Sequence, residues 1–189
     1  VTGADYAVSS LGQENGFLGN DKVKIQLPGN LKKAEKALRA FGMGKQADEL
    51  VETMNHAAEK AVAEAKPILV DAVKKMSVKD AKDILTGGDD SVTQFFKRSS
   101  AEALGLKFKP IVKTATQKVK LAEQYNKFAG RAANLGLLDK KDADLESYIT
   151  QKAMDGLFLM IAEKEKSIRQ NPMGVGSDMM QKVFGALGR

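Results

Sequence analysis

Five basic residues recur along one stretch of the chain at spacings that would place them on a single face of a helix. At 100° per residue, their positions fall within about 40° of one another. A stripe of this kind suits anionic lipid headgroups or cell-envelope polymers, whereas the lack of interleaved aromatic residues disfavours nucleic acid. An ordinary solvated helix face is the competing explanation. The residues of this basic stripe are Lys109, Lys113, Lys120, Lys127 and Arg131.

Three carboxylates, Asp71, Asp155 and Glu163, stand beside apolar residues in the sequence and are candidates for burial. A buried carboxyl group could act as a general acid or base. The sequence pairs none of the three with a nucleophile, and it surrounds none of them with a set of metal ligands. An enzyme that uses these buried carboxylates is therefore an alternative hypothesis, and no residue is assigned as catalytic.

His56 is the only histidine, and the chain has no cysteine. On a helical wheel His56 lies opposite Met54 and Ala58, so we expect it to point to solvent. A catalytic or metal-binding role would also require carboxylates from elsewhere in the chain. Asn55 borders the packed face of the same predicted helix, and we expect it to make a hydrogen bond between packed segments rather than contact a ligand.

Three further motifs have structural explanations that need no ligand. Gly87-Gly-Asp-Asp90 resembles a nucleotide-cyclase signature, but here it joins two predicted helices as a C-cap and an N-cap. Gly42-Met-Gly-Lys45 lacks the first glycine and the Ser or Thr of a phosphate-binding loop. An acidic group has some calcium-loop character without the glycine of the sharp turn, namely Asp139, Asp142, Asp144 and Glu146. We therefore predict no metal and no cofactor.

The elements that position these residues are organised around the stretch Ile149–Ile168. Its centre, Gly156–Ala162, contains no polar residue, and a helix that is apolar on all sides must be buried. The apolar run is too short for a membrane span, which needs roughly 20 residues. The pattern predicts a central helix at about 145–170, with Asp144 as its N-cap and both ends in water.

The composition favours helices over strands. Aromatic residues make up 6% of the 189 residues and there is no Trp, whereas Ala, Leu, Lys, Glu and Met dominate. The length fits one domain, and the absence of cysteine excludes thiol chemistry, disulfides and Cys-ligated zinc. The net charge of +6 is compatible with anionic partners without requiring them. We predict an all-α fold: a single compact domain of seven to eight helices.

The expected order of segments begins with residues 1–29, a partial helix at 3–11 followed by an extended arm in which Val23, Ile25 and Leu27 alternate with polar residues. Residues 30–172 form the helical core. A C-terminal amphipathic helix at 177–188 has an apolar face, and we expect it to be either a fixed part of the core or a lid over a groove. That face contains Met179, Met180, Val183, Phe184 and Leu187.

Several cap residues divide the helical core. Ser77 followed by Asp80 resembles a capping box, and Asp89 or Asp90 is the expected N-cap of the next helix. Gly105 is expected to break that helix, and Pro110 is expected to lie in the first turn of another one. Other expected boundaries are an N-cap at Asn30, a left-handed C-cap at Gly42 and a helix end or kink at Pro67.

Five short motifs resemble the bacterial family called domain of unknown function 4197. They are Gly16-Phe-Leu-Gly-Asn20, Asn55-His-Ala-Ala-Glu-Lys-Ala61, Ala65-Lys-Pro67, Asp155-Gly-Leu-Phe-Leu159 and Ile168-Arg-Gln-Asn-Pro172. The resemblance covers nearly the whole chain and implies a helical, exported bacterial protein, periplasmic or envelope-associated, whose signal peptide or lipoprotein signal precedes Val1. It implies no activity, cofactor or active site.

The main functional hypothesis is a non-enzymatic helical protein that binds an apolar or amphiphilic envelope component, or a protein partner, through a groove between helices. Methionine side chains make adaptable surfaces, although methionine also fills ordinary cores. Lipids, amphiphiles and envelope proteins are thus the expected partners. The methionines near expected grooves are Met54, Met76, Met154, Met160, Met179 and Met180.

Overall fold

The computed structural model describes residues 2–29, 44–117 and 144–171, together with residues 32, 39, 40, 42, 122, 123 and 126. Within these residues it contains helices and no strand, which confirms the all-α class. Six helices are described there, fewer than the seven to eight that the sequence predicts; most of the expected helix at 31–41 and all of the one at 177–188 lie outside this part. The helices are α1 (Thr2–Leu11), α3 (Gly44–Ala63), α4 (Lys66–Lys74), α5 (Val78–Thr86), α6 (Ser91–Thr116) and α8 (Leu145–Gln170).

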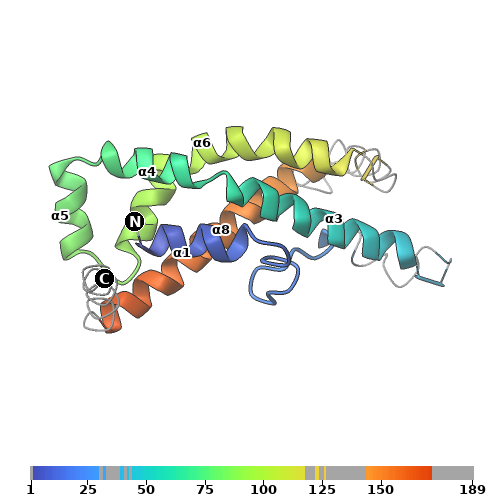
Figure 1. Cartoon of the computed structure of the whole chain (residues 1–189), viewed down its shortest axis with the longest axis horizontal. Helices are drawn as coiled ribbons and strands as arrows, with labels where there is room; N and C mark the ends of the chain where they lie inside the picture. The colour runs from blue at the N-terminus through green and yellow to red at the C-terminus, as the bar shows by residue number, and fades with distance from the viewer. Residues whose placement is uncertain are drawn as a thin grey trace, which may run out of the picture.

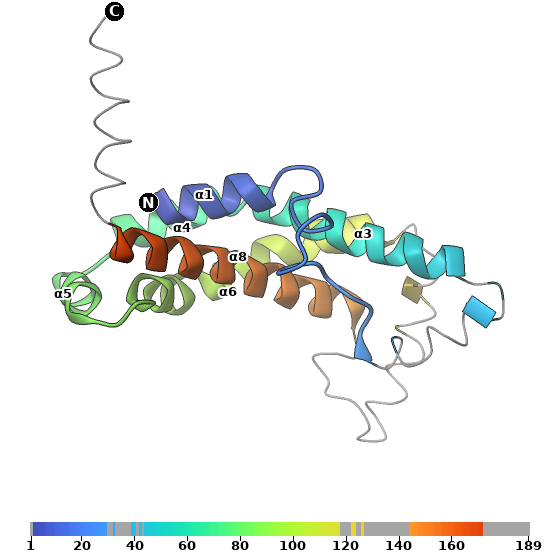
Figure 2. The same cartoon turned by 90° about the horizontal axis from the view of Figure 1, so that it is seen from below.

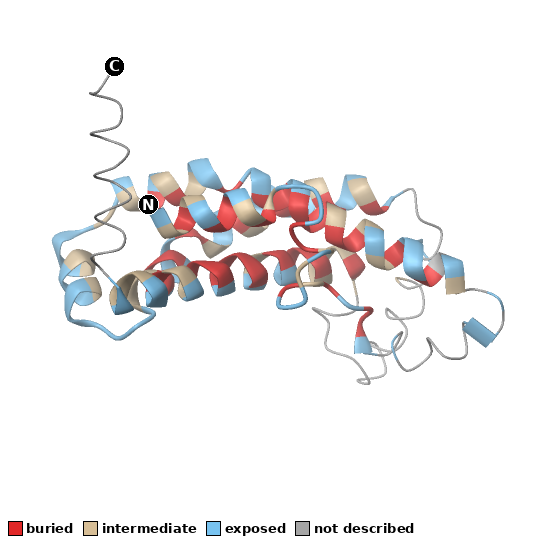
Figure 3. Ribbon diagram, turned by 60° about the horizontal axis from the view of Figure 1, so that its bottom comes forward, coloured by how far each residue is buried: buried red, intermediate tan, exposed pale blue. Residues whose placement is uncertain are grey.

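The described helices form an elongated bundle (Figures 1 and 2). Helix α8 packs against α1, α3 and α6, and α6 also contacts α3, α4 and α5. The buried faces of these helices point toward one another along the length of the bundle (Figure 3). The two longest described helices, α6 and α8, therefore share the central position that the sequence assigned to α8 alone.

One face of α8 is open to solvent. Leu157 and Ile161 are buried as expected, but Leu159 is 41% exposed. The expectation that Gly156–Ala162 is enclosed on all sides is therefore wrong for this face. Because successive residues on a helix are 100° apart, an apolar run of seven residues inevitably places some side chains away from the neighbouring helices.

Helix α6 is continuous through Gly105 and Pro110, so the predicted break and the predicted new helix are both corrected. The buried stripe of Leu104, Phe108 and Val112 has one helical period on both sides of the proline. Pro110 itself is exposed. Burial of this stripe outweighs the lost backbone hydrogen bond and the weak helix propensity of glycine.

The predicted helix ends are mostly confirmed. Asp80 and Ser77 form the capping box of α5, with Asp80 N donating to Ser77 Oγ at 3.1 Å. Asp144 Oδ2 accepts from Ser147 N at 3.1 Å at the start of α8. Gly42 is left-handed with φ 76°, and Pro67 lies in the first turn of α4, so α3 and α4 are separate helices. Asn30 lies outside the described residues.

The segment between α1 and α3 contains the extended arm, which lies across α3 and α8 (Figure 2). Asn55 pairs with Ile25 at both backbone groups: Ile25 N donates to Asn55 Oδ1 at 2.8 Å, and Asn55 Nδ2 donates to Ile25 O at 3.0 Å. Tyr148 Oη on α8 donates to Gln26 O at 3.0 Å. The side-chain amide of Asn55 thus replaces a neighbouring strand, and the predicted hydrogen bond between packed segments is confirmed.

Phe17 fixes the beginning of the arm against α8. Its ring is fully buried, and a Cβ atom added to Gly156 would lie 2.7 Å from Phe17 Cε1. That separation is too short for a carbon–carbon contact. Glycine at position 156 therefore allows the ring to approach the α8 backbone closely.

Candidate functional site

The predicted buried carboxylates are exposed. Asp71 pairs with Lys75 at 2.7 Å, and Glu163 pairs with Lys22 at 2.8 Å. Asp155 Oδ1 accepts a hydrogen bond from Gln151 at 2.8 Å. All three lie on the solvent faces of their helices, since a residue adjacent in sequence to a buried one is turned away from it by 100°. The structure does not bring them together.

Glu59, which is not one of the predicted buried carboxylates, is one of two buried carboxylates among the described residues. Its Oε1 accepts from Phe17 N at 3.0 Å and from Leu18 N at 3.1 Å. Its Oε2 lies 2.6 Å from His56 Nδ1. The carboxylate thus holds the loop that carries Phe17, which is a structural task.

The helical wheel predicts that His56 points to solvent, but in the structure its side chain is only partly exposed. Its side chain is 31% exposed because the ring turns toward Glu59, one helical turn away. It also borders a surface cavity of about 550 Å³ between α3 and α6, whose charged lining includes Lys60. Within the described residues, no group of three metal-ligating side chains surrounds this or any other position.

Glu165 is the second buried carboxylate, and it caps α6 from another helix. It accepts from Val92 N at 2.9 Å, from Thr93 N at 2.9 Å and from Thr93 Oγ1 at 2.8 Å. The predicted cap, Asp90, occupies the N-cap position but makes no side-chain cap bond. A sequence signal for Glu165 existed, because it continues the Leu157 and Ile161 spacing and so falls on the core face.

Arg169 completes a polar cluster around Glu165. Its Nε and Nη2 donate to Glu165 Oε1 at 3.1 and 2.9 Å. Nη2 also donates to Ser91 Oγ at 2.6 Å and to Ile84 O at 3.2 Å. A charge-assisted pair of this kind ties the end of α5 and the start of α6 to α8.

Beside this cluster lies a cavity of about 350 Å³ between α1, α5, α6 and α8, which we call the apolar groove. This volume is within the range of roughly 300–1,000 Å³ typical of small-ligand pockets. Its walls are mostly hydrocarbon, with one ionic pair at the side. The lining residues are Thr2, Gly3, Ala4, Ile84, Leu85, Val92, Phe96, Ile161, Glu165, Ile168 and Arg169.

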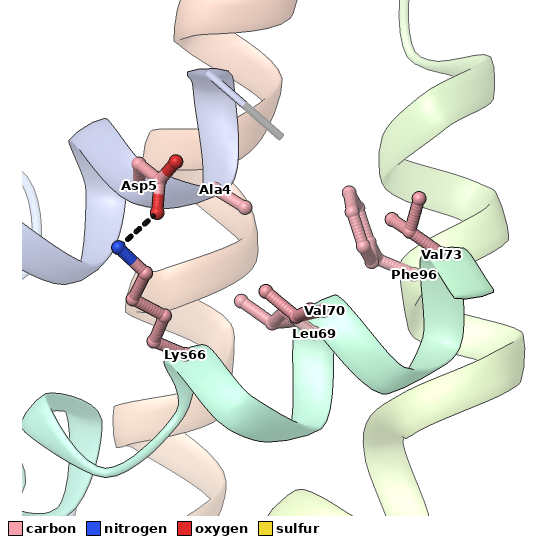
Figure 4. A pocket seen from close by; sticks show the side chains of 7 residues that line it. All are labelled: Ala4, Asp5, Lys66, Leu69, Val70, Val73 and Phe96. Atoms are coloured by element: carbon pink, nitrogen blue, oxygen red, sulfur yellow. Dashed lines mark ion pairs between the residues drawn. The ribbon is translucent and has the colours of Figure 1, made fainter.

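A much smaller cavity of about 10 Å³ lies on the other side of Ala4 and Phe96, between α1, α4 and α6 (Figure 4). Leu69 points into it, and the ion pair of Asp5 and Lys66, 3.0 Å long, lies at its side. A space of this size admits no more than a single water molecule. It is therefore a packing gap and not a ligand site.

A further cavity of about 500 Å³ runs between α6 and α8, and we call it the α6–α8 groove. Two members of the predicted basic stripe, Lys109 and Lys113, are exposed along it, whereas Lys120, Lys127 and Arg131 lie outside the described residues. Its lining residues are Gly105, Leu106, Lys109, Pro110, Lys113, Ser147, Thr150, Gln151 and Met154. The groove therefore combines hydrocarbon with two ammonium groups.

Two acidic residues stand at the start of α8. The hydrogen bond with Asp144 and burial raise the pKa of Glu146. At Asp144, burial raises the pKa. The hydrogen bonds with Glu146 and Ser147 lower it by more, so the pKa of Asp144 lies below its usual value. Asp139 and Asp142, the other members of the calcium-like motif, lie outside the described residues.

These features define an elongated all-helical protein with grooves between its helices and with buried carboxylates that bind backbone groups. None of the helices in the described part has the length and apolar character required to cross a bilayer. A family described as Protein of unknown function (DUF4197) matches residues 1–185, and the chain belongs to this family. No curated protein and no solved structure matches the chain.

Three of the motifs that carry the family resemblance meet in the structure. Phe17 from the first motif contacts Gly156 from the fourth, and Glu59 from the second holds the backbone at Phe17. The family resemblance therefore rests in part on residues that attach the N-terminal arm to α3 and α8. Their contacts are those of a scaffold.

Proposed function

We propose that the protein is a non-enzymatic binding protein that holds the hydrocarbon chain of an amphiphile in the apolar groove. The observation that carries the proposal is a 350 Å³ cavity with aliphatic and aromatic walls and a guanidinium group at its side. Hydrocarbon that enters such a space leaves water, which favours binding roughly in proportion to the apolar area buried.

Arg169 supplies the polar end of the proposed site. Of its four hydrogen bonds, three are donated by Nη2 and one by Nε, whereas Nη1 has no hydrogen-bond partner within the described residues. A guanidinium group has five N–H donors in a fixed plane. The N–H groups of Nη1 can thus donate to a ligand oxygen while the contacts to Glu165 and Ser91 stay in place.

The distribution of carboxylates favours binding over the alternative of an enzyme. The three candidates, Asp71, Asp155 and Glu163, are exposed and engaged with neighbouring side chains. The two buried ones, Glu59 and Glu165, accept hydrogen bonds from backbone N–H groups. General acid–base chemistry needs a carboxyl group that can exchange a proton with a substrate. Glu165 borders the apolar groove, but its oxygens are already engaged by backbone N–H groups, the Thr93 hydroxyl and Arg169.

The proposal extends to the cell envelope, the location that the family resemblance implies. Lipids and other amphiphiles are abundant there, so an apolar groove would have ligands available. Fractionation of the native host with a specific antibody tests this location. Recovery of the protein with the cytoplasmic fraction would contradict it.

The proposed site can be tested with two variants on the same helix. Leu85 lines the apolar groove and is 82% exposed, whereas Val78 is 89% exposed and lies outside the groove. Leu85→Glu should weaken binding of a fluorescent fatty acid at least tenfold, which is about 1.4 kcal/mol, because it replaces an apolar contact by a charge that repels the fatty-acid carboxylate.

Val78→Glu is the matched control and should bind as the wild type does. Fluorescence titration measures both affinities, and circular dichroism verifies that both variants are folded. Equal affinity of the two variants, or a wild type that binds no fatty acid, would refute the proposal. Capture of a peptide in place of the fatty acid would favour a protein partner.

A further inference from the structure

We propose that the α6–α8 groove is a second binding site, which takes the phosphate-bearing headgroup of an anionic lipid. Lys109 and Lys113 would contact the phosphate oxygens together with the hydroxyl of Thr150. The site shares no residue with the apolar groove. Its lining on α8 ends at Met154, seven residues before Ile161, which corresponds to about 10 Å along the helix axis.

The two lysines are one helical turn apart on α6 and so project from the same face. Both side chains are exposed, and Lys109 is 4.0 Å from the nearest oxygen of Asp144, at the limit of an ion pair. Lys113 forms no ion pair within the described residues. Two ammonium groups on one wall are therefore available to an anion.

Thr150 is the observation that points to a ligand. It lines the groove, is only 6% exposed, and its Oγ1 is the one buried side-chain polar atom without a hydrogen-bond partner in the described part of the chain. Nearly all buried polar groups in proteins have a partner. Its Oγ1 atom has almost no accessible surface, so the hydroxyl must rotate toward the groove before an oxygen atom of a bound headgroup can supply the missing partner.

Two threonines on α6 do satisfy their hydroxyl groups. Thr114 Oγ1 donates to Pro110 O at 2.9 Å, and Thr116 Oγ1 donates to Val112 O at 3.1 Å. This bond to the carbonyl four residues earlier is the usual one for a threonine inside a helix. Thr150 departs from that pattern, so its donor is left for something outside its own helix.

The remaining walls favour a lipid over free phosphate. Leu106 is 73% exposed at the groove, and Pro110 and Met154 extend its apolar surface. A free phosphate ion would leave this hydrocarbon in water. The glycerol and first methylene groups of a lipid would cover it, so the groove combines charge complementarity with apolar contact.

The experiment uses dihexanoyl phosphatidylglycerol below its micelle concentration, titrated into the full chain by calorimetry at low salt. We expect binding that weakens with added salt, because screening reduces the attraction between the lysines and the phosphate. Inorganic phosphate and dihexanoyl phosphatidylcholine, which has no net charge, should each bind at least tenfold more weakly.

Three variants separate the site from net charge and from fold. Lys109→Gln with Lys113→Gln should weaken phosphatidylglycerol binding at least tenfold. The control, Lys74→Gln with Lys75→Gln, removes the same charge from exposed positions at the C-terminal end of α4 and should bind as the wild type does. Thr150→Val should weaken binding severalfold while the melting temperature stays equal or rises, because valine removes an unpaired hydroxyl.

Each contrary result overturns a defined part of the proposal. Equal binding of inorganic phosphate and the lipid would exclude the lipid as the specific occupant. An equal loss of phosphatidylglycerol affinity in the Lys74→Gln and Lys75→Gln control would show that binding depends only on net charge. Unchanged affinity in Thr150→Val would show that the Thr150 hydroxyl does not contact the headgroup. If the wild type does not bind phosphatidylglycerol, the proposed site is refuted.

Discussion

At the scale of single residues, side chains that bind backbone groups carry much of this structure. Asn55 substitutes for a missing strand, and Glu59 and Glu165 substitute for missing caps and turns. Each satisfies two backbone groups that would otherwise be buried without a partner. Substituting these polar residues should therefore lower the free energy of unfolding more than substituting polar residues on the surface.

The contribution of Asn55 can be measured by substitution. Asn55→Ala leaves the N–H and the C=O of Ile25 without their partners in a buried position. A buried unsatisfied group costs about 1–3 kcal/mol, so for two groups we expect a loss of about 2–6 kcal/mol in the free energy of unfolding. Urea denaturation measures it, with Gln151→Ala on the exposed face of α8 as the control.

A loss for Asn55→Ala no larger than for the control would mean that water replaces the amide and that the arm is held by its apolar side chains. Amide exchange at Ile25 distinguishes these cases. Its amide should be protected in the wild type and should exchange faster in the variant.

Glu146 should make stability depend on pH. The bond with Asp144 and burial raise the pKa of Glu146, so its protonated form is favoured in the folded state. That contribution is present at low pH and is lost as the pH rises through the raised pKa. Glu146→Gln stays neutral at every pH, so it should melt above the wild type at neutral pH and close to it in acid.

Melting temperatures between about pH 3 and about pH 8 test this sign, with Glu102→Gln on the exposed face of α6 as the control. Asp144 acts in the opposite direction. Because the pKa of Asp144 is lowered in the folded state, its contribution to stability is present at pH values above its unfolded pKa and is lost as the pH falls through the folded pKa. If Glu146→Gln is less stable than the wild type at neutral pH, the ionised form is the favoured one.

At the scale of elements, α6 is capped by a residue of α8 and not by its own sequence. Glu165→Ala would leave Val92 N, Thr93 N and the Arg169 charge without their partner. Breaking a buried pair in this way typically costs about 3–5 kcal/mol. Asp90→Ala should cost well under 1 kcal/mol, because Asp90 makes no side-chain cap bond.

Chemical denaturation measures the free energy of unfolding of both variants. Glu165→Gln is a third variant, which keeps a hydrogen-bond acceptor but removes the charge. Equal losses for Asp90→Ala and Glu165→Ala would show that α6 is capped locally after all.

The two faces of α8 predict unequal effects of the same substitution. Leu157 is fully buried, whereas Leu159 is partly exposed. Leu157→Ala should cost about 2–5 kcal/mol through lost burial and the cavity left behind. Leu159→Ala should cost much less, and similar urea midpoints for the two variants would contradict the orientation of α8 described above.

At the scale of the whole molecule, stability should be uneven along the bundle. Helix α5 has no buried residue and packs on α6, whereas α8 is in contact with three helices. Regions with few buried contacts open at low free-energy cost. We expect the amides of α5 to exchange well before those of α8, and equal protection of the two helices would contradict this gradient.

The amino-acid sequence by itself determined the local features of this protein. The all-α class follows from composition, and the capping box of Ser77 and Asp80 follows from their spacing. The N-cap at Asp144 and the left-handed Gly42 were equally readable. These features depend on residues within one helical turn, where geometry is nearly independent of the rest of the chain. The family resemblance was also correct over residues 1–185.

Only the tertiary structure decided which polar residues are buried and where the helices really end. Glu165 reaches Thr93, 72 positions away, and Glu59 reaches Phe17 across 42 positions. No local pattern specifies such partners. Local propensity predicts that Gly105 ends one helix and that Pro110 lies in the first turn of the next, but packing of Phe108 and its neighbours keeps α6 continuous. Local propensities amount to roughly 1–3 kcal/mol, which burial of a long apolar stripe exceeds.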